Sequence, residues 1–232
     1  MADLGDGPVL VFANGALDDS GWGAPFLARA SAVLAADGGL RHLLPLGRRP
    51  DVLIGDLDSL PPGVDAETMA AQTIRYPRDK DETDLELALL HAIGRYSGRE
   101  VLILGGFGGR VDHMLANVLL LAHPRLLGRP IRFVDDRQSA WLLAADSPPG
   151  ETTIVGAPGD IVSLLPLGGP AHVLATTGLR WPLHDEVLAF GAVRGVSNEM
   201  TAAVATVRLG AGMVVCVHVK QYSVGQCSVR DH

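Results

Sequence analysis

The sequence is poor in cysteine and lacks long apolar runs, and each of these absences excludes a class of protein. Its two cysteines, Cys216 and Cys227, give neither a disulfide framework nor a zinc-binding signature. The chain has no run of about 18 or more apolar residues that could cross a membrane. Its N-terminal segment, MADLGD, lacks the basic and apolar layout of a secretory signal, so we expect a cytoplasmic protein with no membrane partner.

The net charge excludes a class of partner, and the composition indicates a folded core. The formal net charge of −7 argues against nucleic acid as the main partner, because nucleic-acid binding needs a basic face. The 232 residues are 47% hydrophobic and contain no low-complexity tract, so the chain can bury a core as one large or two small domains. Such an acidic chain needs a metal ion or local basic residues to bind phosphate.

The densest chemical signal is the segment Asp79–Glu86, DKDETDLE, with five carboxylates and one lysine in eight positions. Carboxylates this close repel one another unless a cation lies among them, and aspartate oxygens suit Mg²⁺. The chain has only two lysines against seventeen arginines, so composition does not explain Lys80 inside this cluster. A lysine beside metal-binding carboxylates is suited to a nucleotide phosphate, although a solvated acidic turn before a helix has the same pattern.

Two further motifs follow strand-like runs. Gly55–Ser59, GDLDS, comes directly after Asp51–Ile54, and its two aspartates can point at one ion, although Asp and Ser also favour simple turns. Gly105–His113, GGFGGRVDH, follows Val101–Leu104 and leads into a helical pattern, so its N–H groups and Arg110 can bind phosphate. It matches neither the Walker A motif nor the dinucleotide fingerprint. In an open α/β sheet, ligands bind at the carboxyl ends of the strands, where these motifs lie.

The first half of the chain alternates strand-like runs with helical or loop stretches, which predicts a doubly wound, mainly parallel sheet. A helix is predicted over Thr83–Tyr96, where Thr83 and Glu86 form a capping box and Asp84 takes the first helical position. The strands expected in this half are Val9–Ala13, Ala32–Ala36, Asp51–Ile54, Thr73–Tyr76 and Val101–Leu104.

The pattern changes after about Pro130, where short β-rich runs separated by Gly and Pro predict a small antiparallel β-sandwich. We place the boundary so that residues 1–136 form an α/β catalytic domain and residues 137–232 form the β-sandwich domain. The tail from Gln221 onward is expected to be loosely ordered. The strands expected here are Ile131–Val134, Trp141–Ala144, Thr152–Val155, Ile161–Leu165, His172–Thr176, Ala202–Leu209 and Met213–Val219.

Taken in order, the motifs resemble the thiamine pyrophosphokinase family. The catalytic half of the resemblance rests on DGG at Asp37–Gly39, GDLDS at Gly55–Ser59, DKDETD at Asp79–Asp84 and GRVDH at Gly109–His113. The thiamine-binding half rests on TGLRWPL at Thr177–Leu183 and VSNE at Val196–Glu199. Each motif is short, but their order and spacing together are specific and cover most of the chain.

The resemblance implies transfer of the terminal diphosphate of ATP to the hydroxyethyl oxygen of thiamine, which gives thiamine diphosphate and AMP. It implies Mg²⁺ held by Asp56, Asp58 and Asp84, with Asp112 completing the catalytic set. It also implies a homodimer in which the β-half of one subunit faces the catalytic half of the other. By the same resemblance, ATP is bound by Asp79, Lys80, Thr83, Gly109, Arg110 and His113, and thiamine by Asp37, Thr177, Trp181, Ser197 and Asn198.

Three alternatives stay open from the sequence. A diphosphokinase of the same fold that acts on another alcohol, such as a hydroxymethylpterin, would share the catalytic motifs. A non-catalytic sensor of nucleotide or thiamine phosphate would keep the fold, although retention of every acidic position argues against it. A Mg²⁺-dependent phosphohydrolase could use the same paired aspartates. In the second half, Trp181 also fits a packing residue of a sandwich core, and Ser197–Asn198 also fits a turn.

Overall fold

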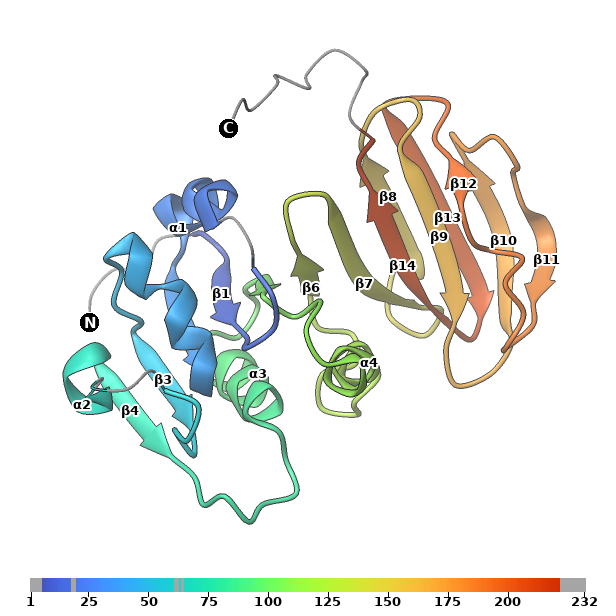
Figure 1. The fold of residues 1–232 in the computed structure, drawn as a ribbon. Coiled ribbons are helices and arrows are strands. Elements are labelled where there is room, and N and C mark those ends of the chain that lie inside the picture. Colours follow the sequence, from blue (N-terminus) through green and yellow to red (C-terminus); the bar gives the residue numbers. More distant parts are fainter. Residues whose placement is uncertain (1–5, 18–19, 61–62, 64, 222–232) are drawn as a thin grey trace. The chain divides into compact units, whose positions relative to one another are not determined.

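The structure is a computed structural model that describes residues 6–17, 20–60, 63 and 65–221 (Figure 1). The chain divides into two compact units, Met1–Asp136 and Arg137–His232. Apart from Gln221, the segment expected to be a loose tail lies outside the described residues, and so does Cys227. Within the described ranges, no helix is both long and apolar enough to cross a membrane.

The described part of the first unit contains six parallel strands in the order β6-β5-β1-β2-β3-β4. Every residue of β5, β1, β2 and β3 is buried, because a parallel sheet covered on both faces needs apolar side chains on both. The chain runs outward from β1 to β4 and then returns to place β5 on the other side of β1. The strands are β1 Val9–Phe12, β2 Ala32–Ala36, β3 Val52–Gly55, β4 Gln72–Arg75, β5 Val101–Leu104 and β6 Ile131–Val134.

This order reverses between β1 and β5, which makes a topological switch point. In doubly wound sheets, the loops that leave the carboxyl ends of the two strands at such a point diverge and open a crevice for ligands. The loops in question begin at Ala13 and at Gly105. The topology alone therefore locates a binding crevice in the first unit.

Helix α3 (Asp84–Arg95) covers one face of the sheet and packs against β1, β2, β3 and β5. Its buried stripe contains Leu85, Leu89 and Ala92, as the 3.6-residue period predicts. The predicted cap is confirmed: the backbone N–H of Glu86 donates to the Thr83 hydroxyl at 3.2 Å. This start point puts the Asp84 carboxylate in the positive first turn of the helix.

The other face of the sheet has a separate apolar core. Alternate strand residues such as Leu10, Phe12 and Leu53 meet Leu40 and Leu43 there. The remaining helical segments of the unit are η1 Ser20–Gly23, α1 Ala24–Arg29, η2 Asp37–His42, η3 Leu44–Leu46, α2 Ala66–Met69 and α4 Val111–Leu120. Helices on both faces confirm the predicted doubly wound class.

The described part of the second unit forms two four-stranded antiparallel arrays, β12-β9-β14-β7 and β11-β10-β13-β8. Their inner side chains, including Trp141, Val173 and Val207, form one apolar core, as predicted for a small sandwich. The strands are β7 Gln138–Ala144, β8 Glu151–Val155, β9 Ile161–Pro166, β10 Ala171–Thr177, β11 His184–Leu188, β12 Asn198–Glu199, β13 Val204–Ala211 and β14 Met213–Val219.

Two strands of the second unit were not predicted. Strand β11 begins with the polar residues His184, Asp185 and Glu186, so it lacks the apolar alternation that marks a strand. It is an edge strand, and polar side chains protect an edge from pairing with other chains. Strand β12 has only two residues, too few for any periodic signal.

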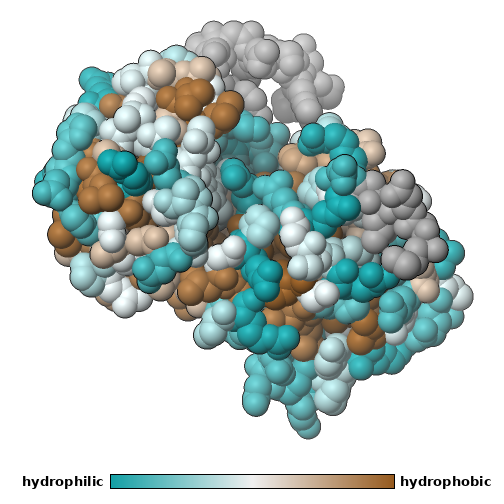
Figure 2. Space-filling model, turned by 180° about the vertical axis from the view of Figure 1, so that it is seen from behind, coloured by the Kyte–Doolittle hydropathy of each residue, from teal (hydrophilic) through white to brown (hydrophobic). Residues whose placement is uncertain are grey.

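Apolar side chains also reach the surface of the second unit. Figure 2 shows hydrophobic residues, in brown, interspersed among hydrophilic ones on one face of the molecule. In the second unit, Val155, Val187, Phe190 and Val193 are each more than half exposed. Helix α4 of the first unit has exposed apolar residues too, since Val111, Leu115 and Leu119 are also more than half exposed.

Candidate active site

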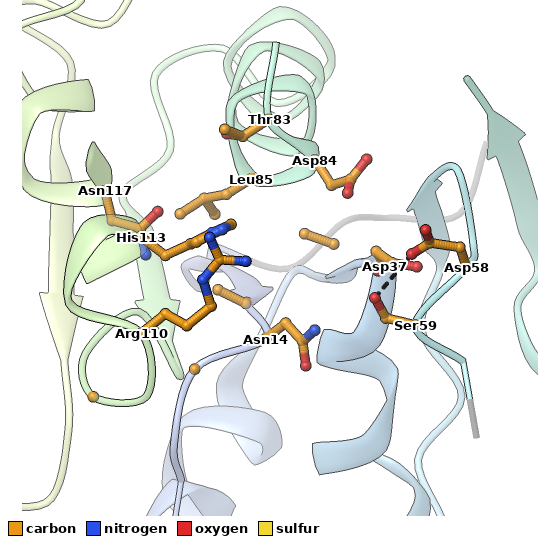
Figure 3. A pocket seen from close by; sticks show the side chains of 14 residues that line it. Asn14, Asp37, Asp58, Ser59, Thr83, Asp84, Leu85, Arg110, His113 and Asn117 are labelled. Carbon is orange, nitrogen blue, oxygen red and sulfur yellow. Dashed lines mark hydrogen bonds between the residues drawn. The ribbon is translucent and has the colours of Figure 1, made fainter. Parts of the chain in front are cut away.

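The loops after β1, β2, β3 and β5 and the first turns of α3 and α4 surround one pocket of about 360 Å³ in the first unit (Figure 3). The pocket lies at the switch point between β1 and β5. It brings together the two acidic motifs and the glycine-rich motif, which are far apart in the sequence. Its lining residues are Ala13, Asn14, Gly15, Ala36, Asp37, Asp58, Ser59, Thr83, Asp84, Leu85, Gly108, Arg110, His113 and Asn117.

Three carboxylates form a compact group at one side of this pocket. Asp37, Asp56 and Asp58 each place one oxygen within 4.8 Å of the others. Asp37 is only 5% exposed, and its Oδ1 accepts no hydrogen bond from the described residues. A buried carboxylate oxygen without a partner costs free energy that a bound cation would recover. The all-oxygen donor set fits Mg²⁺ better than a transition metal.

The backbone around this group is strained and tightly packed. Asp37 and Leu57 have φ values of 44° and 66°, in the left-handed region that non-glycine residues seldom adopt. At Gly55, a Cβ would lie 2.9 Å from the Asp37 Cβ and 3.1 Å from the Asp84 Cγ, so only glycine lets both carboxylates approach. The carboxylates are therefore held close together by the fold before any ligand binds.

Lys80 connects the second acidic motif to this group. Its ammonium lies 3.0 Å from Asp84 Oδ1 and 3.6 Å from Asp56 Oδ2, and its side chain is only 9% exposed. Burial by itself lowers the pKa of Lys80, but the carboxylates of Asp84 and Asp56 outweigh burial and raise it, so the ammonium stays charged.

Asp84, expected among the metal ligands, also forms an ion pair with Lys80. Burial is the main cause that raises the pKa of Asp84; the Lys80 ammonium opposes this rise, and the Asp37 and Asp56 charges add to it. Asp84 lines the pocket as the ion-pair partner of Lys80, whereas Asp37, expected on the thiamine side, belongs to the compact carboxylate group. The sequence pointed to Asp37 through the DGG motif, which the family resemblance assigns to the thiamine side.

The glycine-rich loop presents Arg110 to the pocket. Its Nε and Nη2 donate to the two oxygens of Asp112 at 3.2 and 2.6 Å. These hydrogen bonds are the main cause that lowers the pKa of Asp112 to about 2. Arg110 lines the pocket and Asp112 does not, so Asp112 is connected to the pocket only through the guanidinium that it binds.

The other residues expected around the nucleotide divide into two sets. Thr83 and His113 line the pocket, whereas Asp79 and Gly109 are not among its lining residues. Sequence reasoning missed Asn14, Gly15 and Asn117. The first two follow the strand-like run Val9–Ala13, so the rule that ligands bind at carboxyl ends would have found them. Asn117 lies inside α4 and donates to the Gly106 carbonyl at 3.0 Å, with no local sequence signal.

A second pocket, of about 430 Å³, lies entirely within the second unit. Trp181, Ser197 and Asn198 line it, as expected for residues of one site, but Thr177 does not. The Thr177 hydroxyl instead lies 2.8 Å from the Thr206 hydroxyl on the neighbouring strand. The lining residues are Leu164, Trp181, Pro182, Leu183, Arg194, Gly195, Val196, Ser197 and Asn198.

Trp181 is held by its backbone, and the residue is 56% exposed. The Trp181 N–H donates to Asn198 Oδ1 at 3.1 Å, and Asn198 Nδ2 donates to the Trp181 carbonyl at 2.7 Å. The Arg180 guanidinium lies 5.0 Å from the indole centroid and pairs with Glu199 at 3.0 Å. An exposed tryptophan fixed in this way is not a core residue, so the packing alternative for Trp181 is wrong.

Comparisons with known proteins match the two halves of the chain to two different domains of one family. The family model "Thiamin pyrophosphokinase, catalytic domain" matches residues 24–132, and "Thiamin pyrophosphokinase, vitamin B1 binding domain" matches residues 151–214. Thiamine pyrophosphokinase 1 of Oryza sativa subsp. japonica is 30% identical over 198 residues, which are 75% of this chain and 74% of the relative. The chain belongs to the thiamine pyrophosphokinase family.

Other members of the thiamine pyrophosphokinase family extend the match to the whole fold. The Bacillus subtilis (strain 168) enzyme is 29% identical over 187 residues, which cover 79% of this chain and 85% of the relative. The crystal structure of a thiamin pyrophosphokinase family protein from Enterococcus faecalis is 26% identical and covers 93% of this chain and 100% of its own, with a TM-score of 0.76. The yeast thiamin pyrophosphokinase structure, at 18% identity, shares the fold with a TM-score of 0.74 over 92% of this chain and 86% of its own.

Lys80→Met should weaken the use of ATP more than the binding of thiamine. The substitution removes the ammonium that pairs with Asp84 and Asp56 and leaves their charges to repel phosphate. We expect kcat/KM for ATP to fall by about 10- to 100-fold, as for loss of a charged contact. Steady-state kinetics with each substrate varied in turn checks this. A raised KM for thiamine with an unchanged KM for ATP would assign Lys80 to the acceptor side.

Proposed function

We propose that the pocket of the first unit is the site where diphosphate passes from Mg²⁺-bound ATP to the hydroxyl of thiamine. The family uses ATP and thiamine as substrates, and the products are AMP and thiamine diphosphate. The observation that carries the proposal is the compact group Asp37, Asp56 and Asp58, with Lys80 beside it and Arg110 lining the same pocket. Carboxylates for a divalent cation next to positive side chains for phosphate oxygens are the parts that phosphoryl transfer requires.

Each part has a defined role in the proposed transfer. Asp37, Asp56 and Asp58 would hold Mg²⁺, and Asp84, which lines the same pocket with its Oδ1 3.0 Å from the Lys80 ammonium, is a further candidate ligand. When bound, Mg²⁺ would neutralise charge on the phosphate oxygens. Lys80 and Arg110 would bind phosphate oxygens, and Asp112 would hold the Arg110 guanidinium in place. Thr83 and His113 would line the nucleotide site.

The chemistry asks little of the protein beyond position and charge. The thiamine hydroxyl oxygen forms a bond to the β-phosphorus of ATP, the bond from that phosphorus to the AMP oxygen breaks, and the hydroxyl proton is lost to the surroundings. Side chains already fixed in place stabilise the charge that develops without further reorganisation. The strained backbone at Asp37 and Leu57 supports this preorganised view.

We propose that the pocket of the second unit receives thiamine. The flat indole of Trp181, a residue that is 56% exposed, can stack on an aromatic ring of the substrate, and Ser197 and Asn198 lie on the same pocket. The Asn198 amide is already bonded to the Trp181 backbone, which supports a role in orienting the indole.

We also propose a homodimer in which the thiamine pocket of one subunit completes the catalytic pocket of the other. Each pocket contains only half of the required chemistry: carboxylates and phosphate-binding cations in one, an aromatic platform in the other. The exposed apolar residues of the second unit, such as Val187, Phe190 and Val193, support a partner at that surface.

Removal of the metal should abolish activity reversibly. We expect EDTA to stop formation of AMP and thiamine diphosphate and Mg²⁺ to restore it. Asp56→Asn should lower kcat by about 10²- to 10³-fold with an unchanged melting temperature, because it removes one preorganised charge. The matched control is Glu67→Gln, which removes an exposed carboxylate paired with Arg75 at 3.3 Å. Near-normal turnover by Asp56→Asn at saturating ATP would remove Asp56 from the metal site.

Trp181→Ala should raise KM for thiamine far more than KM for ATP. Loss of one aromatic platform costs about 1–2 kcal/mol, or roughly 5- to 30-fold in affinity. Trp141→Ala is a useful contrast, since Trp141 lies in the core and its loss should lower the melting temperature. Equal changes in both KM values for Trp181→Ala would argue against stacking on thiamine.

Mixed dimers test the shared site. Co-expression of Trp181→Ala with Asp56→Asn should restore part of the activity, because one of the two sites in each heterodimer would have both halves intact. Differently tagged subunits allow the heterodimer to be purified and assayed. A purified heterodimer no more active than the two homodimers would mean that each subunit builds its site alone.

A further inference from the structure

The short loop after β1 is tied to two other loops of the pocket. Arg41 Nη2 donates to the Asn14 carbonyl at 2.9 Å and to the Gly15 carbonyl at 2.8 Å. His42 Nε2 lies 3.0 Å from the same Gly15 carbonyl, and the Gly15 N–H donates to the Gly105 carbonyl at 2.7 Å. Arg41 and His42 belong to η2, which begins with Asp37. The loops after β1, β2 and β5 are therefore one connected structure.

These bonds also control the electrostatics of the loop. Carbonyl oxygens that faced the pocket would repel a phosphate, whereas those of Asn14 and Gly15 are bonded to Arg41 and His42, neither of which lines the pocket. His42 is only 8% exposed, and burial, together with Arg41, lowers the pKa of His42, so its ring is neutral at pH 7. Arg41 thus supplies the positive charge of this anchor.

The Asn14 side chain is exposed, lines the pocket and lies against Gly38. A Cβ at Gly38 would lie 2.5 Å from Asn14 Nδ2 and 2.6 Å from its Oδ1, so the amide packs directly on the Gly38 backbone. Figure 3 shows Asn14 between Arg110 on one side and Asp37 and Ser59 on the other. A phosphate chain that joined the carboxylate group to Arg110 would pass this amide.

We propose that Asn14 is a hydrogen-bond donor to the diphosphate that is transferred, and that Arg41 and His42 are positioning residues that hold it there. The inference rests on the proposed function of the same pocket. A neutral amide suits this place, because it donates to a phosphate oxygen without competing with the cation that the neighbouring carboxylates bind. A lysine or arginine there would pair with the carboxylates instead.

The test compares Asn14→Ala, Arg41→Met and the double variant by steady-state kinetics with ATP and thiamine varied separately. Loss of a hydrogen bond to a charged group should lower kcat/KM for ATP by about 10- to 100-fold in Asn14→Ala. KM for thiamine should change less than twofold. Arg41→Met should show a smaller loss of the same kind. The double variant should be no worse than Asn14→Ala, because Arg41 acts through Asn14.

Two further variants separate positioning from folding. Arg41→Lys should keep most of the activity, since one nitrogen of Arg41 makes both bonds and an ammonium can replace it. Arg48→Met removes an exposed arginine beside Asp51, before the start of β3 and away from the carboxyl edge, and should behave as wild type. Melting temperatures of Asn14→Ala and Arg48→Met should match that of wild type.

Wild-type turnover to AMP and thiamine diphosphate establishes the proposed function independently of these variants. If wild type turns over and Asn14→Ala keeps kcat/KM for ATP within twofold of wild type, the proposed hydrogen bond from Asn14 to the diphosphate is overturned. Losses that multiply in the double variant overturn the positioning role. If wild type fails to turn over, the proposed function falls, and binding of a non-hydrolysable ATP analogue with Mg²⁺ tests the contact alone. Equal affinity of wild type and Asn14→Ala for that analogue would then overturn it.

Discussion

Crowding of negative charge at the carboxyl edge of one parallel sheet is the constraint on which the site depends. Asp37, Asp56, Asp58 and Asp84 converge there, and Lys80 offsets their repulsion only in part. The buried Oδ1 of Asp37 accepts no hydrogen bond from the described residues, and burial is the main cause that raises the pKa of Asp84. A fold that holds carboxylates together at this cost favours a divalent cation, and through it a phosphate ligand.

The sheet topology and a few backbone positions enforce this crowding. The strand order reverses between β1 and β5, so the loops that follow them open a crevice, and the loops after β2 and β3 bring aspartates to its rim. Gly55 allows Asp37 and Asp84 to approach, and Gly38 allows Asn14 to lie against the backbone. Arg41 and His42 then join the loop after β1 to η2. The pocket can therefore bind a cation and phosphate because the backbone geometry brings the carboxylates together, and not only because the sequence contains them.

Local patterns predicted most of the fold but only part of the site. The Thr83 cap, the buried stripe of α3 and the apolar strands could be read because local sequence determines them. Strand β11 could not be predicted, because its polar residues suit an edge strand and leave no periodic apolar pattern. The closeness of Asp37 to Asp56 and Asp58 could not be predicted, because which carboxylates meet depends on loop conformation and on Gly55. Asn14 was missed because an Asn-Gly pair after a strand reads first as a turn.

The most direct test of the account is the binding of Mn²⁺, as a paramagnetic substitute for Mg²⁺, measured by electron paramagnetic resonance with a non-hydrolysable ATP analogue present. A site formed by Asp37, Asp56 and Asp58 should bind one Mn²⁺ tightly per chain in wild type. Asp37→Asn should weaken that binding by at least about tenfold, as expected for the loss of one charged ligand, and Glu67→Gln should leave it unchanged. Wild-type affinity for Mn²⁺ in Asp37→Asn would contradict the claim that Asp37, Asp56 and Asp58 form the metal site.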